Sequence, residues 1–276
     1  MKDLECVSFL QWLLPQMNYQ WKGFRKVRRQ VCKRLQRRLT ELEFVRIEEY
    51  QDYLNENKRE WETLDSLLNI TISRFYRDPQ IFRYIETLLF PSLIQNMIKE
   101  NRNQMNSWSI GCCSGEEPYS LNLIWQLSLP VSIRNRFKLN IVATDSSAAM
   151  LKRANKASYT QGSIRFLPGK YVKFAFMQQG NEFELKEEFR KNITFIQQDI
   201  RDESPAGQFD IILCRNLVFT YFRKHLQQEI LSIIYEKLKI GGYLIIGSHE
   251  KLPLISSELQ PIPECKIIFQ KMPSTD

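Results

Sequence analysis

The chain has 276 residues, 43% of them hydrophobic and 12% aromatic, as in globular proteins that bury a core. It lacks the roughly 18–20 consecutive apolar residues that span a bilayer, and its N-terminus does not resemble a signal peptide. Its net charge of +8 and its six cysteines, which form no CxxC pair, predict a basic cytoplasmic protein with free thiols and no metal site.

Positive charge gathers near the N-terminus. No Asp or Glu lies between Cys6 and Thr40. The bases in this stretch are Lys22, Arg25, Lys26, Arg28, Arg29, Lys33, Arg34, Arg37 and Arg38. Such an asymmetry indicates an acidic partner.

Residues 1–68 are predicted to be helical throughout. Apolar residues recur at three- or four-residue spacing and so form one stripe along a helix, with the bases on or beside the opposite face. The stripe consists of Phe24, Val27, Val31, Leu35 and Leu39. Two further helices are expected, around residues 47–57 and 61–68. We therefore expect a small all-α N-terminal domain, which with the segment that follows it covers residues 1–78.

From about Trp108, short apolar runs alternate with helical patterns. Strands are predicted at 108–110, 139–144, 193–197, 209–214 and 243–247, and helices at 118–129, 148–155 and 225–238. The alternation predicts an α/β domain over residues 79–276 with a mostly parallel sheet. Ligands of such sheets bind at the carboxyl ends of the strands, so the residues after each run are the candidate site.

The first of these strands ends in a glycine-rich turn. Gly111 and Gly115 let the backbone turn sharply, and Glu116 and Glu117 suit the positive end of the following helix. These acids would repel a pyrophosphate but would suit the ammonium group of S-adenosylmethionine. The alternative is an ordinary strand–helix turn with helix-favouring acids.

Polar residues also follow the later strands. Asp145 is suited to accept hydrogen bonds from the hydroxyls of a ribose, or to cap the next helix. Asp199 lies where an adenine would be, or in a surface turn. Arg215 and Asn216 end a buried strand, and a charged arginine there needs a partner, either the cofactor pocket or a structural ion pair.

The order of motifs resembles that of the CheR-type methyltransferases, which esterify glutamate side chains of bacterial chemoreceptors. The resemblance covers nearly the whole chain. The matching segments are Ser73–Asp78, Gly111–Ser120, Ala143–Asp145, Cys214–Asn216 with Tyr221–Phe222, Gly241–Leu244 and Gly247–Glu250. It implies a Rossmann-like S-adenosylmethionine-dependent methyltransferase sheet with a small all-α N-terminal domain. In the family, the region matching residues 159–189 is a small β-subdomain that can contact receptors.

The resemblance also implies roles for single residues. Thr71, Ser73 and Arg77 would face the cofactor, and Glu116 or Glu117 would hold its methionine part. Asp145 would bind the ribose, and Asp199 and Ile200 would border the adenine. Arg215 and Asn216 would complete the pocket, and Arg77 and Tyr221 would position the substrate carboxylate.

Several positions depart from the family pattern. Thr71-Ile-Ser73 replaces the usual Asn-x-Thr, and Tyr221 follows Asn216 by five residues where the family has four. Asp199 stands where asparagine is common, and Asp145 is followed by Ser-Ser.

The expected reaction is methyl transfer to a glutamate carboxylate, which is ionised at neutral pH and needs no general base. We expect the protein to act as a monomer on an acidic protein such as a chemoreceptor methylation helix. Other acceptors stay open: a protein outside chemotaxis, a small acid, or RNA, although the basic helix has few of the interleaved aromatics that stack on bases. A non-catalytic S-adenosylmethionine-binding regulator is the remaining alternative.

Overall fold

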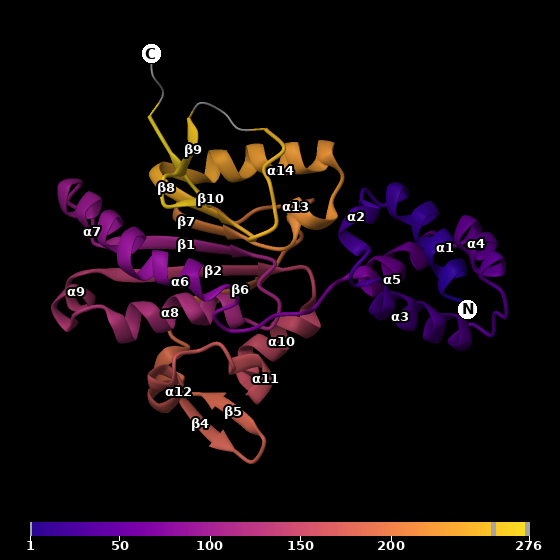
Figure 1. Ribbon diagram of the computed structural model, residues 1–276, viewed down its shortest axis with the longest axis horizontal. Helices are drawn as coiled ribbons and strands as arrows, with labels where there is room; N and C mark the ends of the chain where they lie inside the picture. Colours follow the sequence, from indigo (N-terminus) through magenta and orange to yellow (C-terminus); the bar gives the residue numbers. More distant parts are fainter. Residues whose placement is uncertain (1, 255–257, 274–276) are drawn as a thin grey trace. The chain divides into compact units, whose positions relative to one another are not determined.

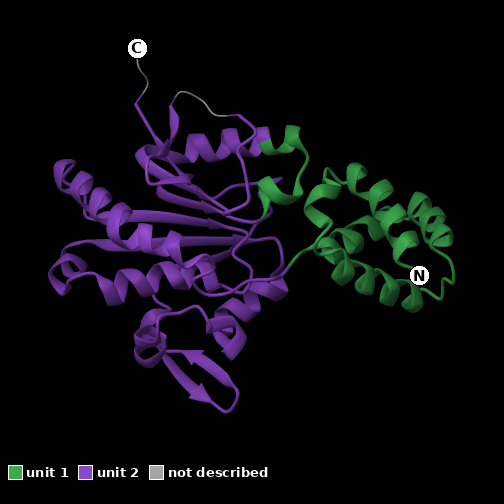
Figure 2. Cartoon of the chain, viewed as in Figure 1, with its two compact units in different colours: residues 1–70, 217–227 green, residues 71–216, 228–276 purple. Residues whose placement is uncertain are grey.

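The computed structural model describes residues 2–254 and 258–273 (Figure 1). The chain divides into two compact units, residues 1–70 with 217–227 and residues 71–216 with 228–276 (Figure 2). The sequence analysis had placed 71–78 with the helical domain and 217–227 with the α/β domain, because it followed the order of the chain and not its packing.

The first unit is helical. Its elements are α1 (Asp3–Gln16), α2 (Trp21–Phe24), α3 (Arg28–Glu41), α4 (Ile47–Glu56), α5 (Lys58–Leu68) and α13 (Val218–Tyr221). The expected stripe is buried at Phe24, Val31, Leu35 and Leu39, but the prediction of one continuous helix was wrong. Residues 25–27 form a turn between α2 and α3. Arg25 and Val27 keep near-helical dihedral angles, so the apolar pattern continues across the break.

The bases of α3 also differ from the expectation, because two of them face inward. Arg38 pairs at 2.7 Å with Glu60, which is 5% exposed and also accepts a hydrogen bond from Tyr50. Burial alone would raise the pKa of Glu60, but the bonds from Arg38 and Tyr50 lower it. Arg34 donates to the carbonyl oxygens of residues 67 and 69, at the end of α5. These two arginines hold the helices together and do not belong to the exposed basic surface.

A disulfide joins Cys6 of α1 to Cys32 of α3. The expectation that all the cysteines are free thiols was therefore wrong for this pair. The two residues are 26 positions apart in sequence, a spacing that carries no signal, and their Cα atoms come within 6.0 Å. Within the described part of the chain the free cysteines are Cys112, Cys113, Cys214 and Cys265.

Residues 217–227 join the helical unit through main-chain hydrogen bonds. The N–H of Gln20 donates to the carbonyl of Tyr221 at 2.7 Å, and the N–H of Arg223 donates to Asn18 at 2.8 Å. Gly23 allows the close approach, because a Cβ there would lie 2.3 Å from the carbonyl oxygen of Thr220. The segment is thus packed into the helices although it is distant from them in sequence.

The second unit is built on an open sheet. Among the described residues, seven strands pair in the order β6-β2-β1-β7-β8-β10-β9. The strands are β1 (Gln104–Ile110), β2 (Lys138–Asp145), β6 (Ile193–Gln197), β7 (Phe209–Cys214), β8 (Leu238–Ile246), β9 (Leu259–Ile262) and β10 (Cys265–Lys271). Pairing is parallel from β6 to β8 and antiparallel between β8, β10 and β9. The chain runs outward from β1 to β6 and then returns to β7, so the strand order reverses between β1 and β7, where sheets of this kind bind ligands.

Helices cover the sheet. They are α6 (Pro79–Tyr84), the π-helical turn η1 (Ile85–Leu89), α7 (Phe90–Lys99), α8 (Glu116–Ser128), α9 (Val131–Arg136), α10 (Ala148–Lys156) and α14 (Lys224–Lys237). Side chains of α6, α7 and α8, among them Phe82, Phe90 and Trp125, share one core with alternate residues of the central strands such as Ile211 and Leu213. All residues of β7 are buried, as expected for a central parallel strand covered on both faces. The predicted α/β architecture is confirmed.

A small subdomain follows α10. In the part of the chain that the structure describes, β3 (Ser158–Thr160), β5 (Glu182–Leu185) and β4 (Phe176–Gln179) form a three-stranded antiparallel sheet. The helices α11 (Gln161–Ile164) and α12 (Gly169–Ala175) and the 3₁₀ turn η2 (Glu187–Phe189) accompany it. The region around 159–189, which had no clear pattern in sequence, is thus a β-subdomain.

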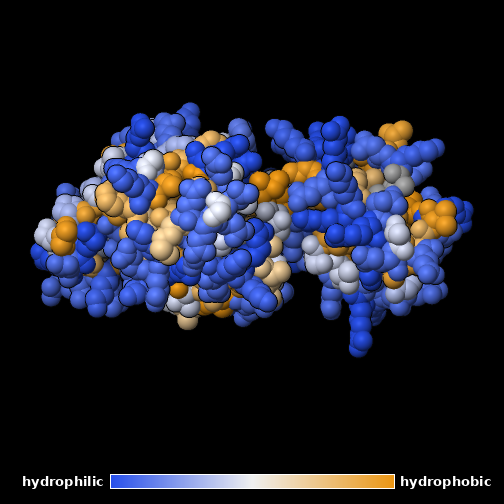
Figure 3. Space-filling view, turned by 90° about the horizontal axis from the view of Figure 1, so that it is seen from below, coloured by the Kyte–Doolittle hydropathy of each residue, from blue (hydrophilic) through white to orange (hydrophobic). Residues whose placement is uncertain are grey.

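The face drawn in Figure 3 is mostly hydrophilic, with apolar residues in small groups. Exposed apolar side chains of the described residues include Phe166, Phe174 and Met177 of the β-subdomain. Over the described ranges, no helix combines the length and the apolar composition that crossing a membrane requires.

Candidate functional site

The turn after β1 has an unusual backbone. Gly111, Cys113 and Gly115 all have positive φ, at 67°, 52° and 88°. A Cβ on Gly115 would lie 3.0 Å from atoms of Ala154 and Tyr119, so this glycine is required by packing as well as by conformation. The turn brings the start of α8 to the carboxyl ends of β1 and β2.

Asp145 ties this turn to the next helix. Its carboxylate accepts hydrogen bonds from the N–H of Cys113 at 2.8 Å and from the N–H of Ser147 at 2.9 Å. Burial raises the pKa of Asp145 and the charge of Asp199 adds to the rise, while the two N–H groups oppose it. The residue thus anchors the turn after β1, and Ser147 is the N-cap of α10. The predicted ribose contact stays a prediction.

Asp199 is already engaged by a neighbour. Arg201 pairs with both of its carboxylate oxygens, at 2.9 and 2.6 Å. Burial alone would raise the pKa of Asp199, but the hydrogen bonds and charge of Arg201 bring it below its usual value. Ile200 is 5% exposed. A contact with adenine at this position would therefore involve the apolar side chain or the backbone more readily than the carboxylate.

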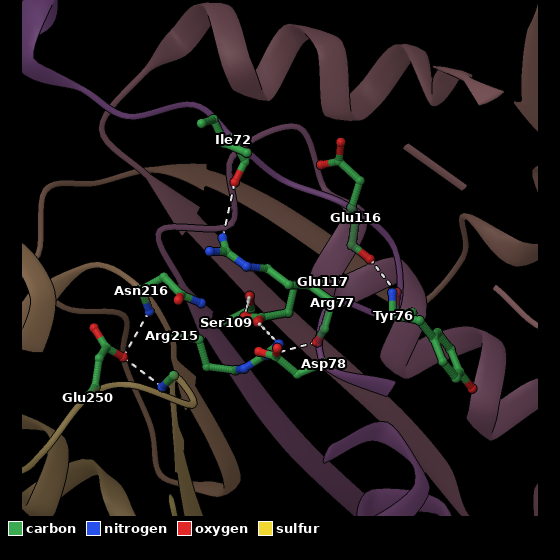
Figure 4. Close-up of polar contacts among 12 residues, drawn as sticks. Ile72, Tyr76, Arg77, Asp78, Ser109, Glu116, Glu117, Arg215, Asn216 and Glu250 are labelled. Carbon is green, nitrogen blue, oxygen red and sulfur yellow. Dashed lines mark hydrogen bonds and ion pairs between the residues drawn. The ribbon is translucent and has the colours of Figure 1, made fainter. Parts of the chain in front are cut away.

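Arg215 lies at the centre of a buried polar network (Figure 4). Its guanidinium pairs with Glu117 at 2.9 Å and Asp78 at 2.8 Å, and donates to the carbonyl of Arg77 at 2.8 Å. Ser109 of β1 donates to the other oxygen of Glu117 at 2.9 Å. The side chain of Arg215 is 2% exposed. One guanidinium thus pairs with both carboxylates, and the network joins the ends of β1 and β7 to the segment before α6.

Glu116 and Glu117 have separate environments. The carboxylate of Glu116 points away from the Arg215 network (Figure 4). It accepts hydrogen bonds from the hydroxyls of Ser114, at 3.0 Å, and Ser163, at 2.9 Å. Among the described residues no cation pairs with it, and it lines a cavity of about 450 Å³ together with Thr71 and Ser73. Of the two acids, Glu116 therefore keeps its charge available for a ligand.

The segment before α6 is held in a strained conformation. Tyr76 and Asp78 have positive φ, at 51° and 63°. The N–H of Tyr76 donates to Ser120 Oγ of α8 at 3.0 Å, and the guanidinium of Arg77 donates to the carbonyl of Ile72 at 3.2 Å. Arg77 is half-buried and does not line the cavity of Glu116. Non-glycine residues in this conformation are typical of functional sites.

Asn216 and Tyr221 follow β7 but belong to different units. Asn216 has φ of 58°, and its N–H donates to the carboxylate of Glu250 at 2.9 Å. Tyr221 lies in the helical unit, is 9% exposed, and packs edge-on against Phe24 at 5.0 Å between ring centroids. Its proposed contact with a substrate carboxylate stays a prediction.

Sequence reasoning missed several residues at this edge of the sheet. Asp78 and Glu250 were quoted only as parts of motifs, and Ser163 was not singled out. An ion-pair partner was required for Arg215, but nothing in the sequence shows that Glu117 and Asp78 supply it. Ser163 lies 47 residues from Glu116, in a region without a clear pattern.

The reversal of strand order, the tight turn after β1 and the cavity beside Glu116 define an α/β protein that binds a nucleoside-type ligand at the carboxyl edge of its sheet. The model of the family described as CheR methyltransferase, SAM binding domain, matches residues 71–267. The chain therefore belongs to the CheR methyltransferase family. The resemblance noted in the sequence is confirmed.

Similar proteins agree with this assignment. The chain is 29% identical to the chemotaxis protein methyltransferase of Borreliella burgdorferi over 76% of this chain and 75% of that protein. It is 29% identical to that of Listeria innocua, over 81% of each. It is 31% identical to chemotaxis protein methyltransferase 1 of Pseudomonas aeruginosa, over 68% of this chain and 69% of that protein. The protein is a methyltransferase whose cofactor is S-adenosylmethionine, as the sequence predicted.

Proposed function

We propose that the protein transfers a methyl group from S-adenosylmethionine to glutamate side chains of an acidic protein such as a chemoreceptor. The observation that supports this most is the composition of the cavity beside Glu116. Its lining contains no histidine or cysteine, and its one tyrosine, Tyr159, has a pKa raised by burial. A glutamate carboxylate is already ionised at neutral pH, so its methylation needs no histidine, cysteine or tyrosine as a general base.

The residues of the site fit the cofactor. Bound S-adenosylmethionine supplies an electrophilic methyl group on a sulfonium. Glu116 accepts hydroxyl hydrogen bonds and forms no ion pair among the described residues, so its carboxylate suits the ammonium of the methionine part. Thr71 and Ser73 line the same cavity. We assign the ribose to Asp145, the adenine to Asp199 and Ile200, and the remaining wall to Arg215 and Asn216.

Arg77 is the residue that we assign to bind the carboxylate that accepts the methyl group. Arg215 holds the carbonyl of Arg77 in place, while the guanidinium of Arg77 donates one hydrogen bond among the described residues, to the carbonyl of Ile72. Such a group can exchange that bond for a substrate carboxylate and orient it. Holding reactants in line is worth roughly 7–11 kcal/mol of the barrier, so orientation can carry much of the catalysis. We assign a supporting hydrogen bond to Tyr221.

The helical unit offers a surface for an acidic partner. Between residues 22 and 38, where the inward-facing Arg34 and Arg38 also lie, the exposed bases are Lys22, Arg25, Lys26, Arg29, Lys33 and Arg37. An acidic helix would be attracted to such a surface, and the attraction would weaken with salt. We therefore propose this basic surface as the docking site of the substrate.

The reaction is tested with S-adenosylmethionine labelled in its methyl group and the cytoplasmic fragment of a chemoreceptor rich in glutamate. The expected product is labelled protein whose label is released as methanol by mild base, as from a methyl ester. Base-stable label, or label in nucleic acid, would contradict the proposal. Cofactor binding without transfer to any acceptor would favour the alternative that the protein is a non-catalytic regulator that binds S-adenosylmethionine.

Two sets of variants locate the reaction on this chain. Glu116→Gln removes the charge proposed to hold the ammonium, so the affinity for S-adenosylhomocysteine should fall roughly tenfold or more. Arg25→Glu with Arg29→Glu should raise KM for the receptor and reduce its salt dependence, with kcat retained. The matched control is Arg136→Glu with Lys138→Glu, which changes charge equally at exposed sites of the other unit. Equal effects of the two pairs would rule out specific docking.

A further inference from the structure

The carboxyl end of β8 carries a buried glutamate with no role in the site described so far. Glu250 is 6% exposed and follows β8 by a short turn, in which its own N–H donates to the carbonyl of Gly247 at 2.9 Å. The Glu250 carboxylate returns to the backbone. Its Oε2 accepts from the N–H of Gly247 at 2.6 Å and from the N–H of Asn216 at 2.9 Å (Figure 4).

One carboxylate oxygen thus links the ends of two neighbouring strands. Asn216 follows β7 and has a left-handed backbone, with φ of 58°. Asparagine adopts that conformation more readily than most residues, but it still needs support from its surroundings. The hydrogen bond that the N–H of Asn216 donates to the Glu250 carboxylate supplies this support.

Gly247 makes the arrangement possible. A Cβ at this position would lie 2.7 Å from Glu250 Oε2 and 3.0 Å from Asn216 Oδ1. No positive φ is involved, so the requirement for glycine here is one of space. The side-chain amide of Asn216 therefore lies against the same backbone that the carboxylate holds, and its orientation depends on both.

We infer that Glu250 is a positioning residue that fixes the backbone and amide of Asn216 for binding of the cofactor. The inference rests on the proposed function in one respect, the assignment of Asn216 to the wall of the cofactor pocket. Glu250 itself need not touch the ligand. Arg215, next in the chain to Asn216, is held by Glu117 and Asp78, so Glu250 completes the support of the strand end on its other side.

The test measures the affinity of the full chain for S-adenosylhomocysteine by calorimetry. Glu250→Ala leaves the N–H groups of Gly247 and Asn216 without their acceptor, and we expect Kd to rise roughly ten- to a hundredfold. Glu250→Gln keeps a carbonyl oxygen that can accept both bonds, so its Kd should stay within about threefold of the wild type. Glu229→Ala, an exposed glutamate of α14 in the same unit, is the matched control and should bind normally.

Two further variants separate positioning from general stability. Gly247→Ala should weaken binding as Glu250→Ala does, because it displaces the carboxylate without removing it. Asn216→Ala with Glu250→Ala should bind no more weakly than Asn216→Ala alone, because Glu250 is inferred to act through Asn216. All variants are measured well below their melting temperatures.

Wild-type affinity in Glu250→Ala would overturn the inference, as would additive losses in the double variant or failure of Glu250→Gln to restore binding. Binding of S-adenosylhomocysteine requires no methyl acceptor. An absence of glutamate methylation would therefore refute the proposed function and leave the role of Glu250 intact. Normal binding in Glu250→Ala would refute the role of Glu250 and leave the proposed function intact.

Discussion

Replacing Arg215 with methionine would remove the cation that pairs with both Glu117 and Asp78. The side chains of these acids are 16% and 32% exposed, so water would partly screen the charges left behind. Breaking a buried ion pair from one side costs about 3–5 kcal/mol, and the partial exposure favours the lower end, about 3 kcal/mol. For a unit of roughly 200 residues this corresponds to a fall in melting temperature of about 6–12 °C.

The assay is thermal and urea unfolding of Arg215→Met beside Arg83→Met, an exposed arginine of α6 whose loss should cost less than about 0.5 kcal/mol. Adding Glu117→Gln to Arg215→Met should recover about 1 kcal/mol or more, since it removes a buried charge that has lost its partner. A loss below about 1 kcal/mol in Arg215→Met, or a further loss in the double variant, would refute the account of this network.

Three other outcomes are expected. Arg77→Ala should lower methyl transfer by roughly 100-fold while changing stability by no more than about 1 kcal/mol, because the residue is half-buried and makes one hydrogen bond; undiminished turnover would remove it from the mechanism. Gly23→Ala should destabilise the helical unit by about 1–3 kcal/mol in urea unfolding, since its Cβ would overlap the carbonyl oxygen of Thr220; unchanged unfolding would show that the segment yields. Burial raises the pKa of Cys113 to about 12. At pH 8 the Cys113 thiol should therefore react with iodoacetamide roughly a thousandfold more slowly in the native than in the denatured protein. Labelling of Cys113 as fast as that of half-buried Cys265 would contradict this expectation.

The sheet was predictable where local pattern and tertiary position agree. The ranges expected for β6 and β7 match the observed strands. β7 is a central parallel strand buried along its whole length, so its sequence is a continuous apolar run with polar residues after it. β9 and β10 were missed. β9 contains Pro261, and only two residues of β10 are fully buried, so neither gives a clear periodic signal at the edge of the sheet.

The site was predictable as a set of strand ends but not as a set of contacts. Sequence reasoning placed Glu116 and Glu117 together. Consecutive residues of a helix point about 100° apart, so the two acids have different surroundings: hydroxyls for Glu116 and Arg215 for Glu117. The pair between Glu117 and Arg215 joins residues 98 positions apart. Spacing along the chain cannot reveal such a contact, although the need of a buried arginine for a partner does predict that one exists.

The helical unit shows the same limit for a different reason. The apolar stripe identified the buried side of α3, but Arg34 and Arg38 showed no sign in sequence that they point inward. Long side chains can reach across a helix to a partner at either side of their own position. Their orientation is decided by Glu60 and by the carbonyl groups at the end of α5, which only the packed structure brings near.

The membership of residues 217–227 in the helical unit bears on how this protein could be divided or recombined. The chain passes between the units at three places, so a cut after residue 70 separates α1–α5 from a segment that they hold. A fragment beginning at Thr71 would expose Phe222 and Tyr221 and leave main-chain groups that pair with Asn18 and Gln20 without their partners. A chimera that takes its N-terminal helices from a homologue would therefore have to take residues 217–227 from the same homologue.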